Sequence, residues 1–330
     1  MKDEFAFINM IKPREYKQST LVMGIGDDAA VYRPSKGMRE VICLDTMIEG
    51  IHFTKETLSP EQIGQKALAI NISDLAAMGA IPRYYLVSVA IPSSWSDTEL
   101  KAIYQGMSSL SDRYEMDLIG GDTVSAKESL VLTVTAIGQV EEGVEFFRSQ
   151  AKPGDTIFVT GTIGSSAAGL ALLLKHGRSG KYSDSEKQLV ILHQEPEPQV
   201  IAGRLFASKC TRMALNDISD GLASESHEIA EASGVSLYIN EESIPLHNAL
   251  LDTVDSVSKR VEYALNGGED FQLIGTVSST EFDELIKDAL KKGIVLTPIG
   301  EVREKAEQLV YIVREGSEEP LAKNGYNHFK

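Results

Sequence analysis

Six short segments of this chain combine carboxylates with glycines or with an otherwise apolar run. In chain order they read GIGDDAA, CLDTMIEGIHF, NISDLAAMGA, LIGGDTV, NDISDGL and NGGEDFQL. Each places an Asp or Glu at the end of an expected strand, in a turn, or on a mainly apolar helix face. A buried carboxylate needs a cation or several hydrogen-bond donors. Six such segments in one chain therefore suggest that they converge on a common site.

The donor atoms in these segments are mostly oxygens, which favours magnesium over zinc. Mg²⁺ prefers carboxylate oxygens and commonly bridges them to the phosphates of a substrate. The two cysteines, Cys43 and Cys210, belong to no C-x-x-C pair, so a zinc site is not expected. The P-loop and protein-kinase motifs are also missing from the sequence. The pattern predicts Mg²⁺–nucleotide or Mg²⁺–phosphate chemistry in which bound metal ions neutralise the phosphates.

Two segments of the first half each admit two interpretations. Asn71 and Asp74 lie three residues apart and share one helix face, either within the site or at the solvent edge of an apolar stripe. Gly121 precedes Asp122, and paired glycines at a strand end either let the backbone approach a ligand or form a tight turn. From these segments alone both interpretations stay open.

Two segments of the second half are crowded with polar side chains. Asp217, Ser219 and Asp220 stand just before an expected helix, which one of them would be enough to cap. Glu269 and Asp270 follow a glycine pair in a similar way. The surplus over the needs of a single cap favours a ligand site.

The stretch VMGIGDDAAV resembles a dinucleotide-binding loop only loosely. Gly24, Gly26 and Ala29 satisfy the pattern G-x-G-x-x-[GA]. No strand–helix–strand unit follows, and the next element is expected to be a strand. We therefore interpret the glycines as a turn that presents Asp28 to a metal ion, while Asp27 either orients the loop or binds through water.

A further Gly-rich turn, TGTIGSSAAG, leads from an expected strand into a helix. Helix N-termini attract phosphate, and a plain connection capped by Ser165 is the alternative. Arg148 and Lys152 lie near the expected domain junction, where they could meet a polyphosphate or face solvent.

The chain is expected to fold as two α+β domains, residues 1–148 and 149–330. Its 330 residues exceed one ordinary core, and 42% of them are hydrophobic. The first half predicts the order β-β-α-β-α-β-β, with its clearest helix between Ser59 and Gly79 and another over 97–114. The second half predicts strands at TIFVTG, TRMALN, GVSLYIN, FQLIGTV and VLTPIGEV, helices at AAGLALLLKHG, ASESHEIAEASG and 280–292, and a surface loop over 178–188.

Charge and hydropathy exclude several classes of partner. The net charge is −16 and no basic stripe is present, so nucleic acid is not expected. No stretch is long and apolar enough for a membrane span or a signal peptide. Both cysteines are expected as reduced thiols. The prediction is a cytoplasmic protein without a membrane partner.

Taken together and in order, these segments resemble the thiamine-monophosphate kinases, a family in the aminoimidazole ribonucleotide synthetase-like ATP-binding superfamily. The resemblance runs from GIGDDAAV through DTMIEGIHF, KALAINISDLAAMGAIP, LIGGDT, RSQAKPGDTIFVTGTIGSSAAGL, DISDGL and GGEDFQL to NGYNHF. Sister enzymes such as selenophosphate synthetase and the hydrogenase maturation dehydratase share the architecture. The segments NISDLAAMGA, EGIHF and GYNHF favour the thiamine family.

The resemblance implies transfer of the ATP γ-phosphate to thiamine monophosphate, assisted by several Mg²⁺ ions. Positions that match the family's metal ligands are Asp28, Asp45, Asp74, Asp122, Asp217 and Asp220. Positions that match its ATP contacts are Tyr104, Gly121, Asp122, Arg148 and Ser219, and those that match substrate contacts are His52, Glu269 and Tyr326. A homodimer is also implied, in which the N-terminal strands of two subunits form a barrel and the C-terminal domain completes the active site.

The chain departs from the family at one place. Where the family usually has Ser/Thr-Thr-Asp, this chain has Cys43-Leu44-Asp45. The two hydroxyl groups are gone, so only backbone carbonyls at positions 43 and 44 could still contact a metal ion.

The expected mechanism needs no catalytic side chain. A phosphate monoester has a second pKa of about 6 and is mostly ionised at neutral pH, so no general base is required. The aspartates would hold Mg²⁺ for an in-line transfer, Arg148 would assist with ATP, and Tyr326 could stack on the thiazolium. The alternatives are a sister ATP-dependent synthetase with another acceptor, or a non-catalytic Mg²⁺–nucleotide-binding module.

Overall fold

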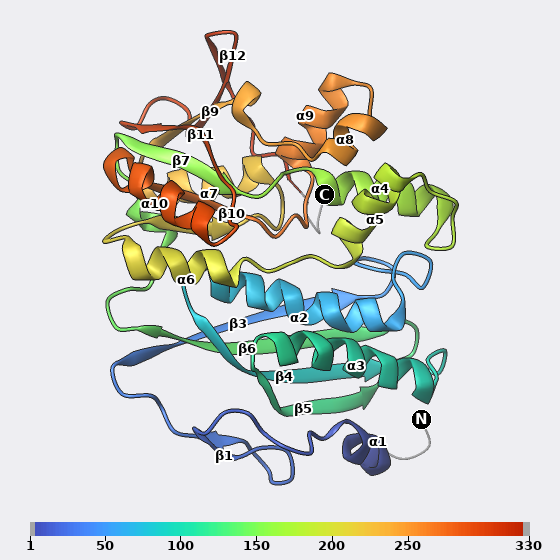
Figure 1. Ribbon diagram of the computed structural model, residues 1–330. Coiled ribbons are helices and arrows are strands. Elements are labelled where there is room, and N and C mark those ends of the chain that lie inside the picture. Colours follow the sequence, from blue (N-terminus) through green and yellow to red (C-terminus); the bar gives the residue numbers. More distant parts are fainter. Residues whose placement is uncertain (1–3, 326–330) are drawn as a thin grey trace. The chain divides into compact units, whose positions relative to one another are not determined.

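The computed structural model describes residues 4–325, and the chain divides into two compact units (Figure 1). The N-terminal unit comprises the chain up to residue 75, residues 80–143 and residues 177–179. The C-terminal unit comprises residues 76–79, 144–176 and the chain from residue 180 onward. Each unit has its own sheet and its own helices, so each is described by itself.

The N-terminal unit is built on a four-stranded sheet with two helices on one face (Figure 1). Its strand order is β3-β6-β4-β5, and only β4 and β5 are parallel. The elements are α1 (Glu4–Ile11), β1 (Leu21–Met23), β2 (Val31–Tyr32), β3 (Met38–Ile48), α2 (Pro60–Ala77), β4 (Ile81–Ile91), α3 (Asp97–Arg113), β5 (Asp117–Ser125) and β6 (Val131–Glu141).

Local sequence sets the start of α2 as the capping pattern predicts. The Gln62 N–H donates to Ser59 Oγ at 3.2 Å, and the Ser59 N–H donates to Gln62 Oε1 at 3.0 Å. This reciprocal pair satisfies two N–H groups that the first helical turn leaves without an intrahelical acceptor. Within GIGDDAAVYRP only Val31–Tyr32 forms a strand, and Gly26 turns the backbone before it at φ +136°.

Helices α2 and α3 approach each other closely at two glycines. A Cβ built on Gly64 would lie 1.8 Å from the Ile103 carbonyl oxygen, and one built on Gly106 would lie 1.9 Å from that of Glu61. Neither position has room for a side chain. This contact holds α2, which carries Asn71 and Asp74, firmly over the sheet.

The C-terminal unit has a seven-stranded sheet with helices on both faces (Figure 1). The strand order is β13-β12-β9-β11-β7-β10-β8, in which only β12 and β9 are parallel. The strands are β7 (Asp155–Thr160), β8 (Ala214–Asp217), β9 (Ser236–Asn240), β10 (Leu273–Ser278), β11 (Leu296–Arg303), β12 (Val310–Arg314) and β13 (Ser317–Pro320). The helices are α4 (Ser165–His176), α5 (Asp184–Gln194), α6 (Val200–Lys209), α7 (Leu222–Ser233), α8 (Asn248–Thr253), α9 (Val257–Asn266) and α10 (Ser279–Lys291), and two 3₁₀ turns cover Arg148–Gln150 and Glu241–Ser243.

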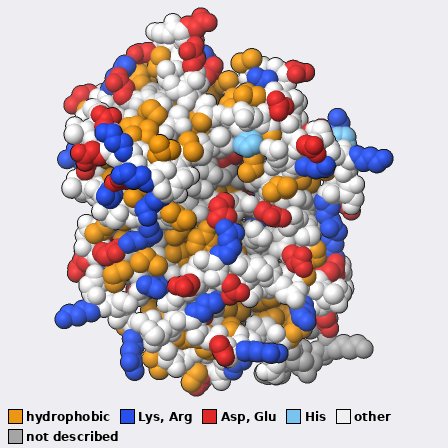
Figure 2. Space-filling model, viewed as in Figure 1, with side chains coloured by type: hydrophobic (Ala, Val, Ile, Leu, Met, Phe, Trp, Pro, Cys, Tyr) orange, Lys and Arg blue, Asp and Glu red, His pale blue; other side chains and the backbone are white. Residues whose placement is uncertain are grey.

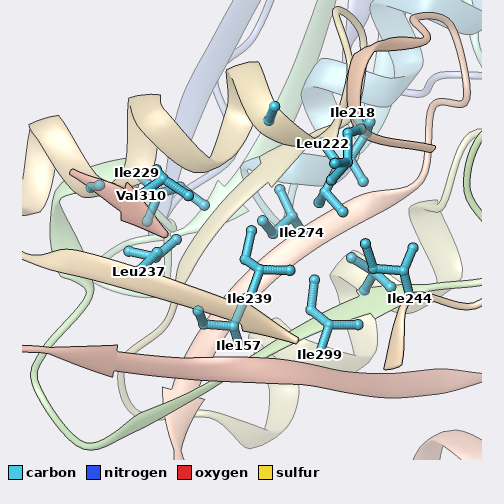
Figure 3. Close-up of a cluster of buried hydrophobic side chains, with 14 of the residues drawn as sticks. Ile157, Ile218, Leu222, Ile229, Leu237, Ile239, Ile244, Ile274, Ile299 and Val310 are labelled. Atoms are coloured by element: carbon cyan, nitrogen blue, oxygen red, sulfur yellow. The ribbon is translucent and has the colours of Figure 1, made fainter. Parts of the chain in front are cut away.

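Two apolar clusters fix these helices to the sheet. Side chains of α7 and α9 pack on one face, against Ile157, Ile239 and their neighbours (Figure 3). Side chains of α6 and α10 pack on the other face, around Phe158. Ile218 and Leu222 belong to the first cluster and are fully buried. They anchor both ends of the polar turn that they enclose.

The sequence missed several elements of this unit. Periodicity did not reveal α6, α8, α9, β12 or β13. The predicted loop over 178–188 is partly helix, because Ser183 accepts the Glu186 N–H at 3.2 Å and so caps α5.

The exposed surface carries both signs of charge. Acidic and basic side chains are interspersed over the face drawn in Figure 2. Among residues 4–325, no helix combines the length and apolarity needed to cross a bilayer.

Candidate active site

Asp45 and Asp74 meet in the N-terminal unit, where β3 passes beneath α2. The connection runs through Asn71, whose side chain is fully buried. Asn71 Oδ1 accepts the Asp45 N–H at 3.1 Å, and its Nδ2 donates to the Ala67 carbonyl at 3.0 Å. The Cys43 thiol donates to the Asn71 carbonyl oxygen at 3.2 Å. Asn71 and Asp74 therefore face the sheet, and the solvent-edge interpretation of this segment is wrong.

The environment of Asp45 suits a cation. Burial raises the pKa of Asp45, while a hydrogen bond with the Asp74 carboxyl and the nearby His52 lower it. Two carboxyl groups that are within hydrogen-bonding reach of each other share either a proton or a cation. His52 is held in place by its Nδ1, which accepts the Ile48 N–H at 3.0 Å. Burial also raises the pKa of the Cys43 thiol, so this side chain remains a neutral thiol.

The sheet register separates Asp122 from this pair. Asp122 is in register with Ser88 on β4, and through β6 with Thr46 on β3. Directly paired residues share a face, so Asp122 points to the face opposite that of Asp45. Strands β3 and β5 are the two edges of the sheet, about 14 Å apart at three strand spacings. Within the N-terminal unit the structure does not bring these two carboxylates together.

The glycine before Asp122 has a structural reason. A Cβ on Gly121 would lie 2.0 Å from the Val87 carbonyl oxygen. The close approach of β5 to β4 therefore requires glycine there. The tight-turn interpretation is wrong, because both residues lie inside β5.

Asp27 and Asp28 lie in an exposed loop held by Tyr16. The Tyr16 hydroxyl accepts the Ile25 N–H at 2.9 Å, and a Cβ on Gly24 would lie 2.3 Å from that oxygen. The Asp28 N–H donates to Asp27 Oδ1 at 2.9 Å. A strand follows, as predicted, so the loop does not enter a helix as a dinucleotide-binding loop does.

Tyr104 borders a cavity of about 300 Å³ within the N-terminal unit. The walls come from the segment 10–17, from α3 and from the start of β5. The cavity is lined by the cations Lys12, Arg14, Lys17 and Lys101 and by the carboxylates Glu15, Asp112 and Asp117. Lys17 Nζ lies 2.7 Å from Asp112 Oδ1. The cavity thus combines aromatic side chains with charged groups of both signs.

In the C-terminal unit, strand order brings two of the polar segments together. The antiparallel β10 lies between β7 and β8, so Leu273 at its start is paired with Asp217 at the end of β8. The segment before β10 then runs along the turn after β8. The Glu269 N–H donates to the Ser219 carbonyl oxygen at 2.7 Å, and the Phe271 N–H donates to that of Ile218 at 2.9 Å.

The side chain of Glu225, a residue of α7, lies against this turn, although no sequence pattern singled it out. Its side chain is 3% exposed, and it accepts the Asp220 N–H at 3.1 Å. Burial, with Glu228 and Asp217 nearby, raises the pKa of Glu225 to about 9. No sequence motif around Glu225 indicates that its side chain returns to the turn.

Arg148 reaches the same turn from its other side. Its Nε donates to Asn216 Oδ1 at 2.9 Å, and its Nη2 lies 3.4 Å from Glu228 Oε2. Arg148 therefore lies beside the predicted residues of the turn. Asn216 and Glu228 also belong to this group, although no sequence pattern singled them out.

The N-terminus of α4 already holds a carboxylate. Asp270 accepts the Gly164 N–H at 2.6 Å and the Ser166 N–H at 3.1 Å. The alternative with Ser165 as the cap is therefore wrong, since Asp270 accepts the first N–H groups of the helix. Asp270 lies just before β10, whose start the strand order places beside the end of β7.

Glu269, the neighbour of Asp270, is partly exposed, at 27% of its side chain. Its Oε2 lies 3.5 Å from His193 Nδ1, which also lies 3.0 Å from Ser166 Oγ. The backbone of Glu269 has φ +66°, a left-handed conformation that costs energy in a non-glycine residue. The turn is thus held in one shape by its neighbours.

Burial of Asp270 predicts a pH-dependent stability. Burial raises its pKa to about 7, above the unfolded value of about 3.9. Its contribution to stability is therefore fully present below about pH 4 and is lost as the pH rises through about 7. Asp270→Asn should remove this dependence. Between pH 5 and 7.5 the wild type should lose roughly 2 kcal/mol more unfolding free energy than the variant, as measured by urea denaturation. Parallel curves would contradict the expectation.

Tyr326 lies outside the described residues, and Gly325, which is described, lies close to the Asp220 carbonyl, so that a Cβ there would be 2.6 Å from its oxygen. Between residues 4 and 325, no group of three or more His, Cys, Asp and Glu side chains could hold a metal ion. Mg²⁺ needs fewer, because one or two carboxylates with substrate phosphates and water suffice, and the Asp45–Asp74 pair fits that requirement.

Comparison with known proteins covers nearly the whole chain. Residues 26–140 match the N-terminal domain, and residues 152–312 the C-terminal domain, of the AIR synthase related proteins. A thiamine-monophosphate kinase from Bacillus subtilis is 51% identical over 328 residues, covering 99% of this chain and 100% of that protein. One from Escherichia coli K12 is 35% identical over 93% of this chain and 92% of that protein.

Solved structures agree with these sequence matches. Thiamine-monophosphate kinase from Stenotrophomonas maltophilia superposes with a TM-score of 0.85 at 33% identity, over 95% of this chain and 98% of that one. The AaThiL complex with AMPPCP and TMP gives a TM-score of 0.79 at 30% identity, over 99% and 97%. Hydrogenase maturation protein HypE, at 16% identity, shares the fold. The chain belongs to the thiamine-monophosphate kinase family of AIR synthase related proteins.

Proposed function

We propose that this chain transfers the γ-phosphate of ATP to thiamine monophosphate, giving thiamine diphosphate, by direct in-line transfer. The observation that carries the proposal is similarity over 99% of the chain to a structure that holds AMPPCP and TMP together. AMPPCP is an ATP analogue with a methylene between its β- and γ-phosphorus atoms. A sister synthetase with another acceptor is less well supported, because HypE shares only 16% identity.

The nucleotide side of the reaction is assigned to residues of both units. The cavity beside Tyr104 offers an aromatic wall and charged groups of both signs, and its volume of about 300 Å³ suits a nucleoside. Arg148 and Ser219 would contact the polyphosphate, and the backbone at Gly121 and Asp122 is expected to contribute. The predicted role of the domains, with the active site completed by residues 149–330, belongs to the same proposal.

The metal ligands are proposed as Asp28, Asp45, Asp74, Asp122, Asp217 and Asp220. All six supply the oxygen atoms that Mg²⁺ prefers. Mg²⁺ bound by these carboxylates would neutralise the phosphates of the two anionic substrates. Position 43 presents a thiol that is directed to Asn71, so the side chain of Cys43 is not among the ligands.

The acceptor side is assigned to His52, Glu269 and Tyr326. The monoester phosphate of the substrate is mostly ionised at neutral pH, since its second pKa is about 6. No side chain of this chain needs to remove a proton from it. The protein's contribution is to bind, orient and exclude water, which is typical of phosphoryl transfer.

The test is the formation of thiamine diphosphate from purified protein, ATP, Mg²⁺ and thiamine monophosphate, with other phosphate and carboxylate acceptors in parallel. Formation of product with thiamine monophosphate, and with none of the other acceptors, supports the proposal. Turnover of ATP with another acceptor would favour a sister synthetase, and nucleotide binding without turnover would favour a binding module. A cytoplasmic location remains a prediction.

A homodimer is also proposed, with the N-terminal sheets of two copies forming a barrel. Ile42 and Leu44 are 63% and 59% exposed, although both lie on β3. They point to the face without helices, and β3 is an edge strand. Exposed apolar side chains on an unprotected edge favour association.

Ile42→Glu combined with Leu44→Glu should therefore shift the protein from dimer to monomer. The two added carboxylates would be desolvated and repel their counterparts at such an interface. Light scattering with size-exclusion chromatography measures the mass. Ile201→Glu, at an apolar residue of α6 that is 65% exposed, is the matched control and should stay dimeric. A wild-type monomer would contradict the barrel.

A further inference from the structure

One buried carboxyl group joins the polar turn before α7 to the arginine assigned to ATP. Glu225 Oε1 accepts the Asp220 N–H at 3.1 Å and lies 3.5 Å from Ser219 Oγ. Its other oxygen, Oε2, accepts a hydrogen bond from Asn216 Nδ2. Both oxygens are thus engaged, each by a different part of the C-terminal unit.

Asn216 passes this connection on to Arg148. Its side chain is 2% exposed, and its Oδ1 accepts the Arg148 Nε–H at 2.9 Å. The Arg148 backbone is fixed as well, since its carbonyl accepts Ser233 Oγ–H at 2.7 Å. An arginine that is anchored at its backbone and at Nε keeps its two terminal nitrogens in one plane and one direction.

We propose that Glu225 and Asn216 are positioning residues for phosphoryl transfer. Glu225 fixes the turn that carries Asp220 and, through Asn216, the direction of the Arg148 guanidinium. The inference rests on the proposed function, since it concerns the residues assigned there to ATP and Mg²⁺. Partners that orient such groups from behind typically matter 10- to 100-fold for metal affinity or activity.

The chemistry of both positions is restrictive. Glu225 must accept hydrogen bonds on both oxygens, and the amide nitrogen of glutamine accepts none. Glu225→Gln therefore breaks one of the two connections while keeping the shape of the side chain. Asn216 offers an acceptor to Arg148 and a donor to Glu225. Asn216→Ala removes both, whereas Glu225 Oε1 can still accept the Asp220 N–H and hold the turn.

The experiment compares Asn216→Ala and Glu225→Gln with Ser226→Ala. Ser226 is equally buried on α7, and its hydroxyl donates only within the helix, to the Leu222 carbonyl oxygen. Asn216→Ala should raise the KM for ATP about tenfold. The KM for thiamine monophosphate and the half-saturating Mg²⁺ concentration should stay within about twofold. Glu225→Gln should raise the KM for ATP or the half-saturating Mg²⁺ concentration by a similar factor. Ser226→Ala should change neither quantity.

A double-mutant cycle tests whether Asn216 acts through the arginine. In an Arg148→Ala background, Asn216→Ala should change the KM for ATP by less than about threefold, because the group it orients is gone. A full tenfold change in that background would overturn the proposal. So would variants that unfold at a lower temperature and yet keep the wild-type KM for ATP.

A readout without turnover separates this inference from the proposed function. The proton on Arg148 Nε gives a ¹H–¹⁵N signal that can be assigned by its loss in Arg148→Ala. This proton should exchange slowly with solvent in the wild type and in Ser226→Ala. In Asn216→Ala it should exchange rapidly. A wild type that makes no thiamine diphosphate contradicts the proposed function alone. Slow exchange that persists in Asn216→Ala overturns the positioning role, whatever the reaction.

Discussion

Asp74→Asn should lower kcat roughly a thousandfold, the scale associated with losing a charge-neutralising group in phosphoryl transfer. The substitution keeps the shape of the side chain and removes one of two oxygen ligands beside the phosphates. It should leave the fold at least as stable as the wild type, because a neutral amide beside Asp45 ends the repulsion between two carboxylates. Activity that falls while stability holds or rises is typical of a group kept for function.

The measurement is the initial rate of thiamine diphosphate formation over a range of Mg²⁺ concentrations, with the melting temperature of each protein. Glu61→Gln is the matched control, since Glu61 is an exposed acidic residue in the first turn of the same helix. Its activity should stay within about twofold of the wild type. If Asp74→Asn retains activity within threefold, Asp74 is a structural residue and its assignment as a ligand is wrong.

Arg148→Ala should lower kcat/KM for ATP roughly a hundredfold, because a planar guanidinium offers charge-assisted hydrogen bonds to phosphate oxygens. Its side chain is 53% exposed, so its contacts with Asn216 and Glu228 contribute little stability. Arg148→Lys should recover only part of the loss, since an ammonium group restores the charge but not the planar pair of donors.

The kinetics should be measured at saturating thiamine monophosphate with ATP varied. Arg314→Ala is a suitable control, because Arg314 is another partly exposed arginine of the C-terminal unit and pairs with Glu241 and Glu319. Equal effects of the two arginine substitutions would show that Arg148 has no specific role with ATP.

The sequence alone determined the local features of this protein. The boundaries of α2 follow from the Ser59–Gln62 capping pair and the apolar periodicity, both of which act within a few residues. The prediction of Mg²⁺ chemistry also rests on local segments, because oxygen ligands without His–Cys clusters indicate Mg²⁺. The position of the segment that holds Asp28 was also assigned correctly as a turn that leads into a strand.

Only the tertiary structure decided which side chains meet. Asp270 closes the N-terminus of α4 from a position 104 residues further along the chain than Ser166, because β10 lies between β7 and β8. Glu225 returns to its own turn because Ile218 and Leu222 are buried on either side of that turn. Asp122 is kept from Asp45 by strand register, in which a shift of one residue exchanges the two faces. Helix capping and apolar periodicity depend on residues that are close in the sequence. Strand order and register depend on the packing of the entire sheet, so no short stretch of sequence encodes strand order or register.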